Sequence, residues 1–242
     1  MPGIVISQSM LFPWVGLLEQ VRQADVFVHY DDVQFSKGSF VNRVQIKTAD
    51  GQRWLTVPLP GLQLGQRIDA VRPAPSAQWR ENHLALLARS FRAAPHAADA
   101  LSLARDIYAQ EYASIGALAR ASLMALVRYF GLEAGRRFVD VADLGVSGTS
   151  SARVLAVVRQ LGGTDYITGH GAARYLAHDE FEAQGVTVRY MDYLRLPYPQ
   201  SHGAFSPYVS GLDLVAHCGR DGSRYIASGT VAWQEFLKRS AG

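Results

Sequence analysis

Two adjacent carboxylates open the stretch of this chain that is richest in candidate catalytic groups. Asp31 and Asp32 lie near the start of residues 29–48, HYDDVQFSKGSFVNRVQIKT. The cations that follow them are Lys37, Arg43 and Lys47. An aspartate can act as general base for an acceptor amine, and cations hold phosphate or carboxylate oxygens. The stretch therefore predicts a site for an anionic substrate, with Asp31 or Asp32 as the base.

Lysine is rare in this chain, and its distribution supports the same interpretation. Of the 24 Lys and Arg residues three are lysines, and two of those, Lys37 and Lys47, lie in this one stretch. Lysine carries a compact charge on a flexible stem, so it can follow a phosphate, and a desolvated lysine can exchange protons. The alternative is that these side chains are solvated charges on a surface hairpin.

Further polar and glycine-rich residues follow other predicted strands, where parallel sheets bind ligands. His170, between two glycines in TGHGAARY, joins Asp31, Asp32 and Lys37 as a candidate catalytic residue. The candidate substrate-binding residues are Gln8, Asn42, Arg43, Lys47, Gly169, Tyr198 and Gln200. We expect all of them to line one cleft. The alternatives are that the two aspartates are turn or cap residues, and that His170 is a solvated residue in a tight turn.

Several kinds of site lack support in the sequence. The seven histidines form no HxH or HxxxH pair, so we expect no metal site, although the two aspartates could hold Mg²⁺ beside a bound nucleotide. No GK[ST] follows the glycines at 169–171, and the sequence identifies no cofactor. The single cysteine, Cys218, is expected to be a buried inert thiol, because helical neighbours such as His217 point about 100° away from it.

Composition places the chain among globular proteins. It has 242 residues, of which 48% are hydrophobic and 19% charged, with a net charge of +3. That charge neither supports nor excludes a tRNA partner. The N-terminus lacks the features of a secretory signal, and no apolar run approaches the ~20 residues of a membrane span. We expect a cytoplasmic protein with no membrane insertion.

Apolar runs alternate with amphipathic stretches along the chain. Strands are expected at residues 3–8, 25–31, 136–144, 164–169 and 186–193, with VTVRYMDY as the last clear strand. Residues 41–59 predict a hairpin that turns at Asp50-Gly51, and residues 77–131 predict a helical insert. The fold class expected is α/β: a single domain, residues 1–242, with a Rossmann-like, mostly parallel sheet.

An ordered series of motifs resembles the WbqC-like family of bacterial proteins. The series is FPW-x-G, D-D-V-Q-F, N-R-x-x-I-K, G-x-G-A-x-x-Y-L and Y-x-Q, and the resemblance covers nearly the whole chain. The chain departs from the family pattern at His217 and Cys218. A weaker resemblance is to the nucleotide-binding half of class I aminoacyl-tRNA synthetases, but residues 12–16, FPWVG, lack the phosphate-binding histidines of that motif.

The family resemblance implies a role in O-antigen or other surface polysaccharide biosynthesis. It implies a transferase that moves an acyl or aminoacyl group, such as glycine, onto a small amino-sugar acceptor. The substrate would be anionic, for example a nucleotide-linked sugar or an aminoacyl donor. The alternative is a non-catalytic module of the same pathway that binds a nucleotide sugar or tRNA, which the lack of a recognised nucleophile pair favours.

Overall fold

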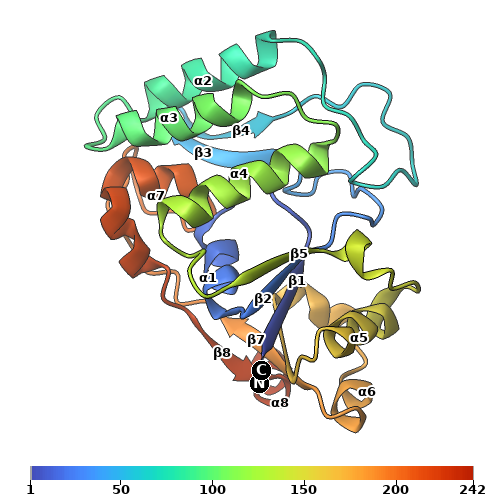
Figure 1. The fold of residues 1–242 in the computed structure, drawn as a ribbon. Helices are drawn as coiled ribbons and strands as arrows, with labels where there is room; N and C mark the ends of the chain where they lie inside the picture. Colours follow the sequence, from blue (N-terminus) through green and yellow to red (C-terminus); the bar gives the residue numbers. More distant parts are fainter. Residues whose placement is uncertain (1, 242) are drawn as a thin grey trace.

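A six-stranded sheet forms the centre of the protein, in a computed structural model that describes residues 2–241. Its strand order is β5-β2-β1-β6-β7-β8, parallel throughout except for the antiparallel pair β7–β8 (Figure 1). The strands are β1 (Gly3–Ser7), β2 (Val26–His29), β5 (Arg137–Asp140), β6 (Asp165–Thr168), β7 (Thr187–Asp192) and β8 (Gly229–Ala232). The α/β, Rossmann-like prediction is confirmed. The edge strand β8 was not expected from the sequence, which lacks a strong apolar run there.

Apolar residues on both faces of the central strands explain why these segments form a buried sheet. Alternate side chains of a strand point to opposite faces. Val5 and Phe27 belong to the apolar core on one face, together with helix α1 (Val15–Gln23). Ile4 and Val28 belong to a second apolar core on the other face, together with helix α5 (Ser150–Gln160). Covering both faces with helices is what a parallel sheet requires.

The expected hairpin stands apart from the main sheet and is covered by helices. Strands β3 (Arg43–Thr48) and β4 (Gly51–Thr56) pair antiparallel, with Ala49 and Asp50 as the loop, one residue earlier than predicted. Helices α2 (Gln78–Ser90), α3 (Ala97–Tyr108) and α4 (Ile115–Tyr129) lie within the predicted insert (Figure 1). Their apolar residues join the same core as Val5 and Phe27, so hairpin, helices and sheet share it.

The remaining elements complete the sheet's surroundings. They are α6 (His178–Ala183), α7 (Gly211–Cys218), α8 (Trp233–Ala241) and the short 3-10 helices η1 (Val141–Leu144), η2 (His170–Arg174) and η3 (Gly219–Tyr225). Helix α7 packs against α3, and α8 packs against β7 and β8. Within residues 2–241, every helix falls short of the length and apolarity that a membrane crossing demands.

Candidate functional site

The order of strands creates a crevice between β1 and β6. From β1 the chain passes through α1 to β2 on one side, whereas β6, on the other side of β1, is reached through α5 on the opposite face. In open parallel sheets ligands bind beyond the carboxyl ends of the strands at such a switch in direction. A cavity of about 720 Å³ opens there. We call it the strand-end cavity.

The strand-end cavity is lined by residues at or just after the ends of β1, β2 and β6, with others from α1 and the start of α5. Its polar and glycine lining includes Ser7, Gln8, Gln20, Tyr30, Asp32, Gln34, Gly148, Thr149, Ser150, Arg153, Tyr166, Thr168, Gly169, Gly171 and Tyr175. Of the residues singled out in the sequence, Gln8, Asp32 and Gly169 lie here. A Cβ at Gly169 would stand 3.2 Å from the Tyr193 hydroxyl and 3.4 Å from Gln20 Nε2, so glycine lets these two side chains approach closely.

Asp32 lines the cavity and forms a bidentate ion pair with Arg153 of α5. The guanidinium Nη1 and Nη2 donate to its two carboxylate oxygens at 2.9 and 2.5 Å. Arg153 also donates through Nε to the Val146 carbonyl at 3.0 Å and lies 5.0 Å from the Tyr30 ring centroid. The hydrogen bond with Asp32 raises the pKa of Arg153. These contacts fix one cation and one anion in the wall of the cavity.

The first turn of α5 presents backbone donors to the same cavity. Thr149 is the N-cap residue in extended backbone conformation, and its side chain makes no capping hydrogen bond. The first N–H groups of a helix lack partners within the helix and carry partial positive charge. Because Gly148, Thr149 and Ser150 all line the cavity, an anionic group of a ligand would find donors here.

Three tyrosines supply the aromatic part of the lining. They are Tyr30, Tyr166 and Tyr175, and burial raises the pKa of all three phenols. They are therefore neutral hydrogen-bonding groups with flat faces at physiological pH. Tyr175 is 47% exposed although it lines the cavity. Such faces suit a sugar or a nucleobase.

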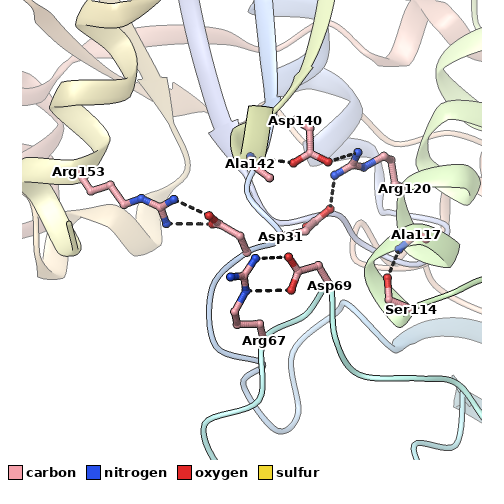
Figure 2. A network of polar contacts seen from close by, with 10 residues as sticks. Asp31, Arg67, Asp69, Ser114, Ala117, Arg120, Asp140, Ala142 and Arg153 are labelled. Atoms are coloured by element: carbon pink, nitrogen blue, oxygen red, sulfur yellow. Dashed lines mark hydrogen bonds and ion pairs between the residues drawn. The ribbon is translucent and has the colours of Figure 1, made fainter. Parts of the chain in front are cut away.

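Asp31 points away from the strand-end cavity into a buried network. Its carboxylate accepts hydrogen bonds from the Ser9 N–H at 2.8 Å and the Ser9 hydroxyl at 2.6 Å. Arg120 of α4 lies between Asp31, at 3.3 Å, and Asp140, at 2.7 Å (Figure 2). Burial raises the pKa of Asp31, and the Ser9 and Arg120 contacts oppose that shift. A second cavity of about 490 Å³ is lined by Asp31, Arg120 and Asp140 on this side.

Ser9 is part of this network, but it is not placed as a nucleophile. Its hydroxyl lies 3.1 Å from His29 Nδ1, and its own proton is donated to Asp31. Burial, and then the nearby Arg120, lowers the pKa of His29 to about 3, so the ring is neutral and Nδ1 donates to the hydroxyl. Since Ser9 is fully buried, no substrate can reach it.

The other predicted residues lie outside the strand-end cavity, so the single cleft expected from the sequence is not formed. Lys37 is exposed, and Asn42 Nδ2 donates to the Val57 carbonyl at 3.0 Å. Arg43 donates to the Gly38 carbonyl and stacks on Trp54 at 4.2 Å. The imidazole of His170 points to the Met191 carbonyl at 2.8 Å.

Lys47 belongs to a separate group with Tyr198 and Gln200. It is 5% exposed, and its ammonium donates to Gln200 Oε1 and to the carbonyls of Gly203 and Ala204, at 3.2, 3.2 and 2.7 Å. Burial lowers its pKa. This ammonium links the hairpin to the loop after β7. A flexible lysine can reach these three oxygens, two from backbone carbonyls and one from the Gln200 amide, whereas a rigid arginine fork would not fit them.

Sequence reasoning missed Arg153 and the Thr149 turn as parts of the site. Nothing in the sequence of α5 marks Arg153 as the partner of Asp32. The only available signal was position: the helix precedes β6, so its first turn lies at the carboxyl edge of the sheet. No group of three or more His, Cys, Asp or Glu side chains suited to a metal ion occurs in residues 2–241.

The fold and the strand-end cavity together define a doubly wound α/β protein with a cavity at its topological switch point. The chain belongs to the WbqC-like protein family, whose model matches residues 8–225. It is 29% identical over 230 residues to the uncharacterized protein Rv1507c of Mycobacterium tuberculosis, covering 93% of this chain and 98% of that protein. No solved structure matches the chain significantly.

Proposed function

We propose that this protein transfers an acyl or aminoacyl group onto a small amino-sugar acceptor. The acceptor binds in the strand-end cavity through an anionic part, such as a linked nucleotide. The observation that carries the proposal is the position of this cavity at the switch point, with the first turn of α5 and the Asp32–Arg153 pair in its wall. Its volume of about 720 Å³ is in the range of pockets that enclose small ligands.

Each part of the lining has a role in this proposal. The N–H groups at the start of α5 hold the anionic part, and Tyr30 and Tyr175 hold the flat or apolar part. The acceptor amine attacks the acyl carbonyl, and Asp32 takes the proton that the amine loses as the C–N bond forms. The donor's leaving group departs with the electrons of the broken acyl bond. Asp32 can accept that proton while one of its oxygens stays bonded to Arg153.

A charge placed at the first turn of α5 tests where the anion binds. Thr149→Asp adds a negative charge there, while aspartate is a favourable N-cap residue, so the fold should be retained or stabilised. Thr149→Asn is the matched control with a good cap and no charge. Nucleotide sugars should raise the melting temperature of the wild type and of Thr149→Asn, because a ligand stabilises the state that binds it. Thr149→Asp should lose that shift.

Two results would contradict the proposal. Equal shifts for Thr149→Asp and Thr149→Asn would place the ligand's charge elsewhere. The absence of any shift in the wild type, with nucleotide sugars and with aminoacyl donors alike, would remove the strand-end cavity as their site.

A non-catalytic binding module of the same pathway is the second candidate. It is favoured by the pairing of both candidate bases with arginines, Asp31 with Arg120 and Asp32 with Arg153. A ligand that shifts the melting temperature is incubated with the protein and an acyl or aminoacyl donor. Mass spectrometry of the mixture then distinguishes the transferase from the binding module. A product that forms with wild type and is lost in Asp32→Asn supports the transferase, whereas binding without any product supports the module.

A further inference from the structure

A second polar cluster lies where the hairpin, the loop after β7 and helix α7 meet. Ser201 of the loop faces His217 near the end of α7, with its Oγ 2.9 Å from His217 Nε2. On its other side His217 faces Asp213, one helical turn earlier: Nδ1 lies 2.9 Å from the Asp213 carbonyl and 3.4 Å from its Oδ1. Serine, histidine and aspartate thus stand in the order of a nucleophile, its base and the group that orients the base.

The neighbours of His217 determine which of its nitrogens carries the proton. Both atoms near Nδ1 are oxygens of Asp213 that can only accept, so Nδ1 holds the proton. Nε2 then carries the lone pair, and the Ser201 N–H donates to it at 2.9 Å, which also holds the serine beside the ring. Ser201 Oγ lies at the same distance from Nε2 and shares this acceptor with the N–H. Nε2 is therefore positioned to take the hydroxyl proton, as the base of such a triad must.

The carboxylate of Asp213 is buried beside His217 and interacts with the Lys47 ammonium. The residue is 1% exposed, and its Oδ1 accepts no hydrogen bond from the described residues. The hydroxyl of Tyr198 nearby is likewise buried without a hydrogen-bond partner among them. Burying polar atoms without partners costs a few kcal/mol each. Burial lowers the pKa of His217, but its contacts with Asp213 outweigh this and raise it, which is the effect required of an orienting carboxylate.

The backbone after Ser201 supplies donors for a developing oxyanion. His202 and Gly203 have φ values of 64° and 83°, and left-handed backbone is uncommon for a non-glycine residue such as His202. Within the described residues, the N–H groups of His202 and Gly203 donate to no protein acceptor. The N–H of the residue after a nucleophile is a recurrent oxyanion donor.

A basic cavity lies directly beside this loop. It has a volume of about 380 Å³ and is lined by His202, Arg53 and Arg89, among others. Neither arginine forms an ion pair within residues 2–241, and Asp50 is the one acidic residue in the lining. Unpaired guanidinium groups suit a ligand with a phosphate or carboxylate.

We propose that Ser201 is a nucleophile that takes an acyl group from an ester or thioester whose leaving portion is anionic and binds at Arg53 and Arg89. Ser201 Oγ attacks the carbonyl carbon while its proton moves to His217 Nε2. As the tetrahedral intermediate collapses, the bond to the leaving oxygen or sulfur breaks and that atom takes the proton. Water, activated by the same nitrogen, then releases the acyl group as a carboxylic acid and restores the serine. The proposal is independent of the strand-end cavity.

Covalent labelling of the native protein tests this directly. A fluorophosphonate probe reacts with an activated serine by losing fluoride and forming a stable phosphonyl ester, and peptide mass spectrometry identifies the labelled residue. We expect label on Ser201 and none in Ser201→Ala, while Ser147→Ala, which removes an exposed serine elsewhere, should label as the wild type does. His217→Gln should slow labelling about 100-fold or more, since it removes the base.

The pH profile distinguishes a catalytic histidine from one that merely anchors the loop. The base must be neutral, so the labelling rate should rise with pH through the raised pKa of His217 and level off above it. Asp213 raises the pKa of His217 and the nearby Lys47 ammonium lowers it, so Asp213→Asn should shift that rise to lower pH. If native wild type leaves Ser201 unlabelled under conditions that label trypsin, or if labelling does not depend on His217, the proposal is overturned.

Discussion

Removing Asp32 and Arg153 one at a time should cost more stability in total than removing both charges together. The side chains of Asp32 and Arg153 are 12% and 10% exposed and share two hydrogen bonds. Each therefore neutralises a charge that would otherwise be buried without a partner. Removing one partner of a buried pair costs about 3 kcal/mol or more. Arg153→Met also loses the bond to the Val146 carbonyl, about 1 kcal/mol. We therefore expect Arg153→Met to lower the free energy of unfolding by about 3–4 kcal/mol.

The double variant is the decisive comparison. Asp32→Asn should cost about 2 kcal/mol alone, because the amide oxygen still accepts one bond from Arg153. In Asp32→Asn with Arg153→Met no buried charge remains, and the double loss should fall about 2 kcal/mol short of the sum of the single losses. Urea unfolding followed by the fluorescence of the four tryptophans measures all four proteins. Additive losses, or a loss below about 1 kcal/mol in Arg153→Met, would refute a buried pair at this site.

Two further predictions concern pH and helix capping. Burial lowers the pKa of His29 to about 3 and that of His83 to about 4, below the unfolded value of ~6.5. Each therefore contributes stability that is present above pH ~6.5 and lost as pH falls toward its folded pKa, about 2 kcal/mol from each between pH 6.5 and 5. The urea midpoint of the wild type should fall as the pH is lowered through that range, and the midpoint of His29→Gln should fall less steeply. An equal dependence on pH in the two proteins would mean that His29 takes up its proton while the protein stays folded. Ser114 accepts from the Ala117 N–H at 3.1 Å as the N-cap of α4, so Ser114→Ala should cost about 1 kcal/mol. Ser147→Ala should leave the free energy of unfolding unchanged. Equal urea midpoints for Ser114→Ala and Ser147→Ala would argue against a capping role for Ser114.

Sequence patterns predicted the elements whose formation depends on neighbouring residues. The apolar runs at β1, β2 and β6 are long enough to be buried on both faces, so a parallel sheet followed from them. The hairpin was predicted to within one residue of its turn because Gly51, at φ 101°, adopts a conformation that favours glycine. The edge strand β8 was not predicted, because it is short and only partly buried and its apolar pattern is therefore weak.

Sequence also indicated where the chemistry should lie, since the carboxyl ends of parallel strands meet at one edge. Gln8, Asp32 and Gly169 are at that edge, around the strand-end cavity. Adjacent residues were harder to assign. Asp31 and Asp32 look alike in the sequence, yet one is bonded to Ser9 and Arg120 in a buried network and the other faces a cavity.

What the sequence by itself determined was the class of fold, the family and the edge of the sheet that carries polar groups. Which polar groups meet was decided by the tertiary structure. Asp32 finds Arg153 across 121 positions of the chain, and Lys47 finds Gln200 across 153. The alternation of apolar and polar residues along a strand depends on residues close together in the chain, so it can be recognised in the sequence. The partner of a buried charge is set by how helices and loops pack, because only burial makes an unpaired charge costly enough to fix its partner.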